Sequence, residues 1–374
     1  MSISMLRVRV LLKKELRQML RDPKMRGVLF VAPIIQLVIF GYAVNTDIRD
    51  TATFVIDHDR TAISRQLLEA FETTGYFEVV ASSDRPADLV RALDHGDATV
   101  GIEIPAGFAR DVSAGRGAQV QVILDGTDSN AATVAQGYAG QIVQQYGLKR
   151  AAAAGTFPAG GVDLRTRAWY NPGLESRVYN VPAVIGVLIL LMSLLLTSMS
   201  VVREREMGTL DQLTVSPLSA TELMLGKTLP PMLAAFVVLF LITAVAILWF
   251  GIPMRGSNLV LLPAAFLYIV SGLSLGLLIS TISKTQQEAF MSMFLFLLPA
   301  IILSGFFYPI SSMPRVFQWL TLLNPLRHFL EVVRAVFLKG AGITDLWRQY
   351  AALTIMAAGT LWLATVRFRR TVTM

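Results

Sequence analysis

The chain has 374 residues, of which 54% are hydrophobic and 16% are charged, and its formal net charge is +7. Because a soluble domain usually carries about 25% charged residues, this composition excludes a protein that is soluble throughout. The absence of cysteine excludes disulfides, thiolate catalysis and cysteine metal sites. In a soluble protein, this excess of Lys and Arg over acidic residues would suggest nucleic-acid binding. In an apolar chain, however, Lys and Arg gather at membrane edges, so no nucleic-acid partner is expected.

The first 26 residues predict a cytoplasmic helix that lies on the membrane surface. Between residues 3 and 22, apolar side chains recur at helical spacing on one side and basic side chains lie on the other. Such a helix binds the headgroup plane of an anionic leaflet, so lipid is an expected partner. Arg-Asp-Pro at 21–23 ends it, because the residue before a proline avoids helical geometry. The apolar side holds Met5, Val8, Leu12, Leu16, Met19 and Leu20, and the basic side holds Lys13, Lys14, Arg17 and Arg21.

Six charge-free runs each span or nearly span a hydrocarbon core about 30 Å thick, which needs about 20 residues of helix. The first run is too long for a signal peptide, and no good small-x-small cleavage site follows it. The predicted fold class is an α-helical polytopic membrane protein with six transmembrane helices and an inserted extracytoplasmic α/β domain. The predicted spans are 27–46, 178–202, 228–250, 259–282, 289–308 and 348–366.

Lys and Arg counts orient these spans. The first 26 residues carry eight basic residues, which places the N-terminus in the cytoplasm. Alternation through six spans then puts the 203–227 loop and the tail 367–374 inside. The external segment 315–348 carries five basic residues, against the rule. Six spans with both termini cytoplasmic is still the consistent solution.

Residues 47–177 form the one large hydrophilic block. Apolar, β-rich pieces alternate there with helical patterns, which predicts a small α/β domain outside the membrane. Strand-end aspartates such as Asp57 and Asp59 favour turn and capping roles over acid–base chemistry. The strands are predicted at 53–56, 77–80, 99–104 and 120–124, and the helices at 63–71, 86–93, 108–112 and 131–146.

A region rich in glycine and proline, residues 309–347, follows the fifth predicted span. The apolar stretch between its breaks is too short to span the membrane, and irregular backbone at membrane depth must be buried in protein or face water. Two short helices that dip into the outer leaflet and return would fit, and a simple external loop is the alternative. The residues that mark the breaks are Gly305, Pro309, Asn324 and Pro325.

Two motif matches fail on their context. Gly226-Lys227-Thr228 ends like a phosphate-binding loop, but the earlier glycine and the preceding strand are missing. Lys227 is therefore expected to snorkel to the interface at the start of the third span. Residues 272–276 match a hydrolase nucleophile pattern, yet small residues four apart inside a span predict a helix-packing surface. No metal site is expected, and the lack of charge near the middle of any span argues against a self-powered transporter.

The most informative segment is the charged stretch Arg203-Glu-Arg-Glu-Met-Gly-Thr209, which follows 25 uncharged residues. Together with the residues up to Lys227, it closely resembles the cytoplasmic loop of ABC-2 type transporter permeases. The amphipathic start, the external block and the stretch from Ser304 to Gly340 agree with that family. The resemblance covers nearly the whole chain and is similar to the bacterial drug-export subgroup with an extracytoplasmic domain.

The resemblance implies a permease subunit of an ATP-driven exporter in the bacterial inner membrane, moving a drug-like, lipidic or other amphipathic substrate outward. The chain itself would hold no cofactor, and ATP and Mg would be bound by separate ABC ATP-binding subunits. A second permease, identical or paralogous, is implied, and whether a periplasmic adaptor binds residues 47–177 stays open. The residues implied to contact the ATP-binding subunit are Arg203, Glu204, Arg205, Glu206, Gly208, Thr209, Asp211, Leu213 and Pro217.

One alternative from another class is a membrane sensor whose external α/β domain binds a ligand and signals inward. Such sensors usually have few spans and a sizeable cytoplasmic output domain, whereas the largest internal loop predicted here has about 25 residues. An intramembrane enzyme would need paired catalytic residues within the spans, and the sequence offers none. The chain is therefore not expected to be an enzyme.

Overall fold

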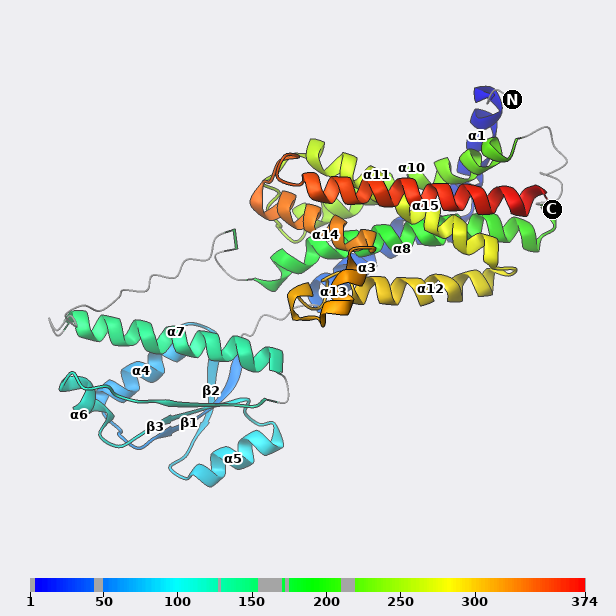
Figure 1. The fold of residues 1–374 in the computed structure, drawn as a ribbon. Helices are drawn as coiled ribbons and strands as arrows, with labels where there is room; N and C mark the ends of the chain where they lie inside the picture. Colours follow the sequence, from blue (N-terminus) through cyan, green and yellow to red (C-terminus); the bar gives the residue numbers. More distant parts are fainter. Residues whose placement is uncertain are drawn as a thin grey trace. The chain divides into compact units, whose positions relative to one another are not determined.

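The computed structural model describes residues 4–43, 50–126, 129–153, 170–171, 175–209 and 219–373. The chain divides into two compact units. One unit comprises Met1–Asn45 and Ala168–Met374, and the other is Thr46–Arg167. The first is almost entirely helical, and the second combines a sheet with helices (Figure 1).

The smaller unit is a four-stranded sheet in the order β2-β1-β3-β4, in which only β4 is antiparallel to its neighbour. The alternation of β-rich and helical segments in the sequence produces this arrangement, since parallel neighbours need helical crossovers. Helices α4 and α7 cover one face, and α5 lies on the other (Figure 1). The elements are β1 (Thr51–Asp57), α4 (Ala62–Glu72), β2 (Phe77–Ser82), α5 (Pro86–His95), β3 (Val100–Ile104), α6 (Phe108–Ser113), β4 (Gln121–Leu124) and α7 (Ser129–Ala153).

The two aspartates at the end of β1 have structural roles, as predicted. Asp57 accepts hydrogen bonds from the amides of the following turn. Asp59 accepts from Thr61 and from the backbone amides of Gly107 and Ala109, which begin α6. Burial raises the pKa of Asp59, but these hydrogen bonds outweigh it and hold the pKa below its usual range. Its negative charge therefore fixes α6 to the end of β1.

Four helices of the larger unit are long and apolar enough to cross a membrane: α8, α10, α11 and α15. Two shorter apolar stretches, Gly27–Ala43 and Gln286–Ile302, coincide with the first and fifth predicted spans. The six-span count therefore remains a prediction. The elements are α1 (Met5–Arg21), α2 (Pro23–Arg26), η1 (Gly27–Val31), α3 (Ala32–Ala43), α8 (Ser176–Glu206), α10 (Ala220–Leu248), α11 (Asn258–Ile282), α12 (Gln286–Ile302), η2 (Ile310–Ser312), α13 (Arg315–Thr321), α14 (Pro325–Arg334), η3 (Ala335–Lys339) and α15 (Trp347–Thr373).

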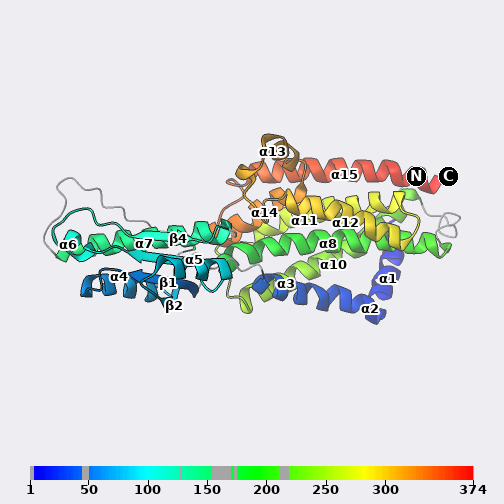
Figure 2. The same cartoon turned by 90° about the horizontal axis from the view of Figure 1, so that it is seen from below.

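Helix α8 is the centre of this unit, and α11 packs closely along it (Figure 2). A Cβ atom added at Gly276 would lie 2.9 Å from the carbonyl oxygen of Leu194, and one at Gly272 would lie 2.9 Å from the Cβ of Ser193. Both distances are shorter than a side chain tolerates. The prediction that these small residues form a helix-packing surface is confirmed.

The predicted breaks after the fifth span coincide with turns and helix starts. Gly305 has a φ of +80°, which favours glycine. Pro309 precedes η2, and Pro325 is the first residue of α14. Asn324 caps α14 through the amide of Leu326 and donates a hydrogen bond of 2.6 Å to the carbonyl of Ala300. Two short helices, α13 and α14, are present, and their depth in a membrane stays a prediction.

Candidate functional site

Helix α1 runs steeply across the ends of the long helices and packs against α10 (Figure 2). The predicted helix is confirmed, and Asp22 ends it in an extended conformation before Pro23. Its buried face differs from the predicted stripe, because Leu11 and Glu15 are buried while Met5 and Leu20 are exposed. The reason is the partner helix, which presents a small residue and a charge to this face.

That small residue is Gly226. A Cβ atom there would lie only 2.1 Å from Cδ2 of Leu11, so the glycine lets α1 and α10 approach closely. Leu11 continues into an apolar cluster formed by the ends of α8, α10, α11 and α15. Gly226, which matches the end of a phosphate-binding loop in sequence, is thus the residue at which α1 and α10 cross.

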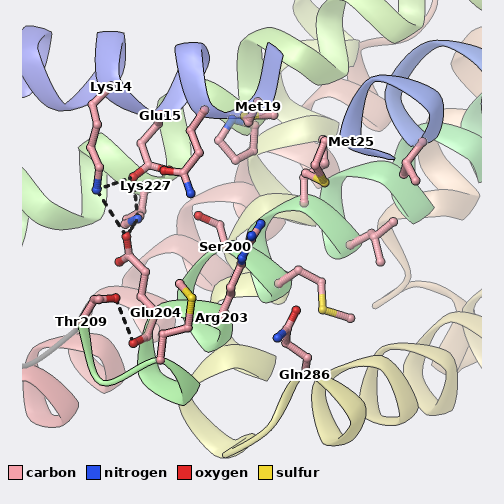
Figure 3. Close-up of a pocket in the computed structure, with 17 residues that line it drawn as sticks. Lys14, Glu15, Met19, Met25, Ser200, Arg203, Glu204, Thr209, Lys227 and Gln286 are labelled. Carbon is pink, nitrogen blue, oxygen red and sulfur yellow. Dashed lines mark hydrogen bonds and ion pairs between the residues drawn. The ribbon is translucent and has the colours of Figure 1, made fainter. Parts of the chain in front are cut away.

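Next to Gly226, Lys227 joins three helices through a buried charge cluster (Figure 3). Its Nζ donates to Oε1 of Glu15 on α1 at 2.7 Å and to Oε1 of Glu204 on α8 at 2.5 Å. The Lys227 side chain is only 2% exposed. The expectation that Lys227 snorkels to the interface is therefore wrong, because two carboxylates compensate its charge inside the protein.

A second lysine completes the cluster. Nζ of Lys14 lies 3.7 Å from Oε1 of both Glu15 and Glu204, and this side chain is about half exposed. Two lysines thus face two carboxylates, and the cluster as a whole is neutral. Oε2 of Glu204 is buried without a hydrogen-bond partner in the described part of the chain. Breaking a buried ion pair on one side leaves an uncompensated charge, at a cost of about 3–5 kcal/mol.

The charged segment after the second predicted span continues α8 as far as Glu206. The sequence places Glu204 on a surface that contacts a partner, but the structure buries it in the cluster with Lys227. Arg205 donates to the carbonyl of Ser283, and Glu206 accepts from the amide side chain of Gln286. Both contacts fix the end of α8 to the segment where α11 meets α12.

Arg203, Glu206 and Gly208 are exposed, and they form the accessible part of the predicted contact. Gly208 turns the chain with a φ of +68° directly after α8. Thr209 donates a hydrogen bond to the carbonyl of Glu204. The other predicted contact residues, Asp211, Leu213 and Pro217, lie outside the described residues.

The start of α1 is tied to the start of α10 by Glu222. This carboxylate accepts from the amide of Ser219, which caps α10, and from the amide of Ser4 at 2.7 Å. Arg7 lies 3.8 Å from it. Helix α1 is therefore held to α10 at two positions along its length, once through Glu222 of α10 and once through its own Glu15, and both carboxylates are buried.

A cavity of about 680 Å³ opens beside the charge cluster, between α1, α2, η1, α8, α10 and α12 (Figure 3). Of the basic residues predicted on the outer side of α1, Lys14 lines it, whereas Lys13, Arg17 and Arg21 are exposed elsewhere on the helix. Among the described residues, no group of three or more His, Cys, Asp or Glu could hold a metal ion.

Sequence reasoning missed Glu15 and Glu222. Glu15 is the single acidic residue in α1, and it lies at the edge of the apolar stripe, three residues after Leu12. An acid on an apolar stripe requires a buried cation, which is a signal that could have led to Lys227. Glu222 stands three residues after Ser219, the spacing of a capping box, and this signal also was readable.

Known proteins match this chain over nearly its whole length. The sequence profile described as ABC-2 family transporter protein matches residues 27–366. The probable multidrug ABC transporter permease YbhR of Escherichia coli strain K12 is 34% identical over 98% of this chain and 99% of its own length. YbhS of the same strain, with the same description, is 32% identical over 98% of each chain. YhhJ, an inner membrane transport permease of this strain, is 28% identical over 96% of each chain. The chain therefore belongs to the ABC-2 family of transporter permeases, which are transport components and not enzymes.

Proposed function

We propose that this chain is the transmembrane subunit of an ATP-driven exporter of amphipathic, drug-like or lipidic molecules in the inner membrane of a bacterium. ATP and Mg would be held by separate ABC ATP-binding subunits. The relatives YbhR and YbhS are described as probable multidrug ABC transporter permeases, which supports this proposal. The relatives are transport proteins, which gives no support to the sensor alternative.

The observation that carries the proposal is the end of α8. An exposed charged surface, Arg203 and Glu206 with the Gly208 turn, stands one residue from a carboxylate buried against α1 and α10. A force applied by a partner to this surface would reach two other helices through Glu204 and Lys227. The direct route from an exposed surface to a buried joint is what coupling to an external motor requires.

The remaining parts of the assembly follow as proposals. Both termini would lie in the cytoplasm and the α/β unit outside, so partner subunits and the outer domain would lie on opposite sides. Two permease copies, identical or paralogous, would form the transport path. Whether a periplasmic adaptor also binds residues 47–177 stays open. An epitope inserted in the α/β unit should be labelled from outside intact cells, and labelling only after lysis would overturn this topology.

The docking role is tested by reversing one exposed charge. In Glu206→Arg, co-purification with a candidate ABC ATP-binding subunit should weaken by about tenfold or more, because like charges then oppose each other. Asp94→Arg, an exposed acid on α5, is the matched reversal and should leave the complex intact. The variant must still insert in the membrane. Unchanged assembly and transport in Glu206→Arg would remove the docking role.

A further inference from the structure

The cavity beside the charge cluster has two chemically different walls. One wall is apolar and rich in flexible side chains from α1, α2 and α8, namely Met19, Met25, Leu195, Leu196 and Met199. Methionine adapts to ligands of irregular shape because it is unbranched and polarizable. A volume of about 680 Å³ lies within the range of small-molecule sites in proteins.

The rest of the cavity lining carries accessible positive charge. Lys14 and Arg203 line the cavity with side chains that are 52% and 44% exposed. Both cations form long ion pairs at the rim: Nζ of Lys14 is 3.7 Å from Glu15 and Glu204, and Arg203 is 3.9 Å from Asp22. Both cations can therefore still accept an anionic group.

The carboxylates in the cavity wall are not available in the same way. Glu15 and Glu204 each give one oxygen to Lys227, and both side chains are at most 10% exposed. The unpaired Oε2 of Glu204 is enclosed by protein, so a cation in the cavity would not reach it. The accessible charge favours an anionic ligand with an apolar body.

We propose that this cavity binds one anionic phospholipid, with its headgroup in the positive field of Lys14 and Arg203 and an acyl chain along the methionine and leucine side chains. The cavity lies between α1, which is predicted to lie in the headgroup plane, and the helices predicted to span the membrane. A phospholipid matches both neighbours. The inference goes beyond the proposed function, since binding requires no ATP-binding subunit.

The test uses the purified full-length chain alone, in a non-ionic detergent, with native mass spectrometry as the readout. The probes are dioleoyl phosphatidylglycerol, dioleoyl phosphatidylcholine with the same chains, and free glycerol phosphate. Phosphatidylglycerol should bind about 30-fold more weakly to Lys14→Gln/Arg203→Gln, as two basic contacts to an anionic lipid predict. The control Arg9→Gln/Arg26→Gln removes two exposed charges outside the cavity and should bind as the wild type does.

A conservative pair, Lys14→Arg/Arg203→Lys, keeps both charges and should retain binding, which separates charge from misfolding. Three results would overturn the proposal. They are an equal loss in the control pair, equal binding of phosphatidylcholine, and competition by glycerol phosphate as strong as that of the lipid. Because no ATP-binding subunit is present, failed co-purification of the complex would leave this result unaffected.

Discussion

Helix α8 is held at two places by different physical means. Along its middle, α11 packs against it by close approach at Gly272 and Gly276, in a contact that uses no charged side chain. At its end, α1 and α10 hold it through the buried charges of Glu204, Glu15 and Lys227. The first contact loses stability when something larger is inserted, and only a little when one polar group is removed. The second loses stability when any one partner is removed, because the others are left buried and uncompensated.

This difference separates a rigid part of the helix from a part that can be switched. The packed contact between α8 and α11 (the seam) has no alternative partners. Carboxylates and lysines, in contrast, can exchange partners when a helix shifts. The ionic joint also lies beside the surface proposed for the ATP-binding subunit.

The largest effect is expected from Lys227→Met. Removing the cation leaves two buried carboxylates with only the half-exposed Lys14, and the free energy of unfolding should fall by about 3–5 kcal/mol. The measurement is equilibrium unfolding of the full chain in mixed detergent micelles. The triple variant Lys227→Met/Glu15→Gln/Glu204→Gln should regain most of the loss, since no buried charge remains unpaired. If Lys227→Met were as stable as the triple variant, charge pairing would not explain how Glu15, Glu204 and Lys227 hold the helices together.

A smaller loss is expected from Gly276→Leu in the seam. The new side chain would push against the Leu194 carbonyl and Thr197, and overpacking of this kind costs about 1–3 kcal/mol. Gly359→Leu is the matched control, because nothing lies within 4 Å of a Cβ atom at that position of α15. The same unfolding assay compares the two. If both variants lost equal stability, close approach to α8 would not explain the glycine.

The smallest effect is expected from Tyr268→Phe. The Tyr268 hydroxyl donates to the carbonyl of Gly186 at 2.9 Å, and a hydrogen bond between membrane helices contributes about 0.6 kcal/mol. Tyr268→Leu should cost more, because it also removes the ring stacked on Phe329 with centroids 4.2 Å apart. Unfolding of the two variants side by side gives the comparison. If Tyr268→Phe were as unstable as Tyr268→Leu, the hydroxyl hydrogen bond and not the packing of the ring would account for the contribution of Tyr268.

Local patterns in the sequence predicted much of the architecture. The β1 strand, predicted at 53–56, is found at Thr51–Asp57, and the helix predicted at 86–93 is α5, Pro86–His95. Such elements are determined by local patterns, namely alternating apolar residues, prolines and glycines, which lie only a few residues apart in the sequence. The predicted span ends at residue 202, whereas helix α8 continues through the charged residues to Glu206. Arg and Glu are good helix formers, so loss of hydrophobicity does not end the helix.

The candidate site was only half predictable. The exposed surface around Glu206 follows from a charged segment at the foot of a span. The burial of Glu204 and Lys227 does not, because it depends on α1, whose residues lie far away in the sequence. A lysine near a span end is normally exposed to water, and only the approach of α1 at Gly226 encloses it. Burial of charge is a property of the assembled helices, which a local window does not contain.

The distance along the chain between Glu15 and Lys227 has a consequence for synthesis. The two residues are 212 positions apart, so Glu15 leaves the ribosome long before its cation exists. Helix α1 cannot take its final place until α10 has been made, and a nascent chain must keep this acid hydrated in the meantime. Its docking is thus a late event that requires the first turns of α10, and a chain that stops before residue 227 would expose an unanchored N-terminus to quality control.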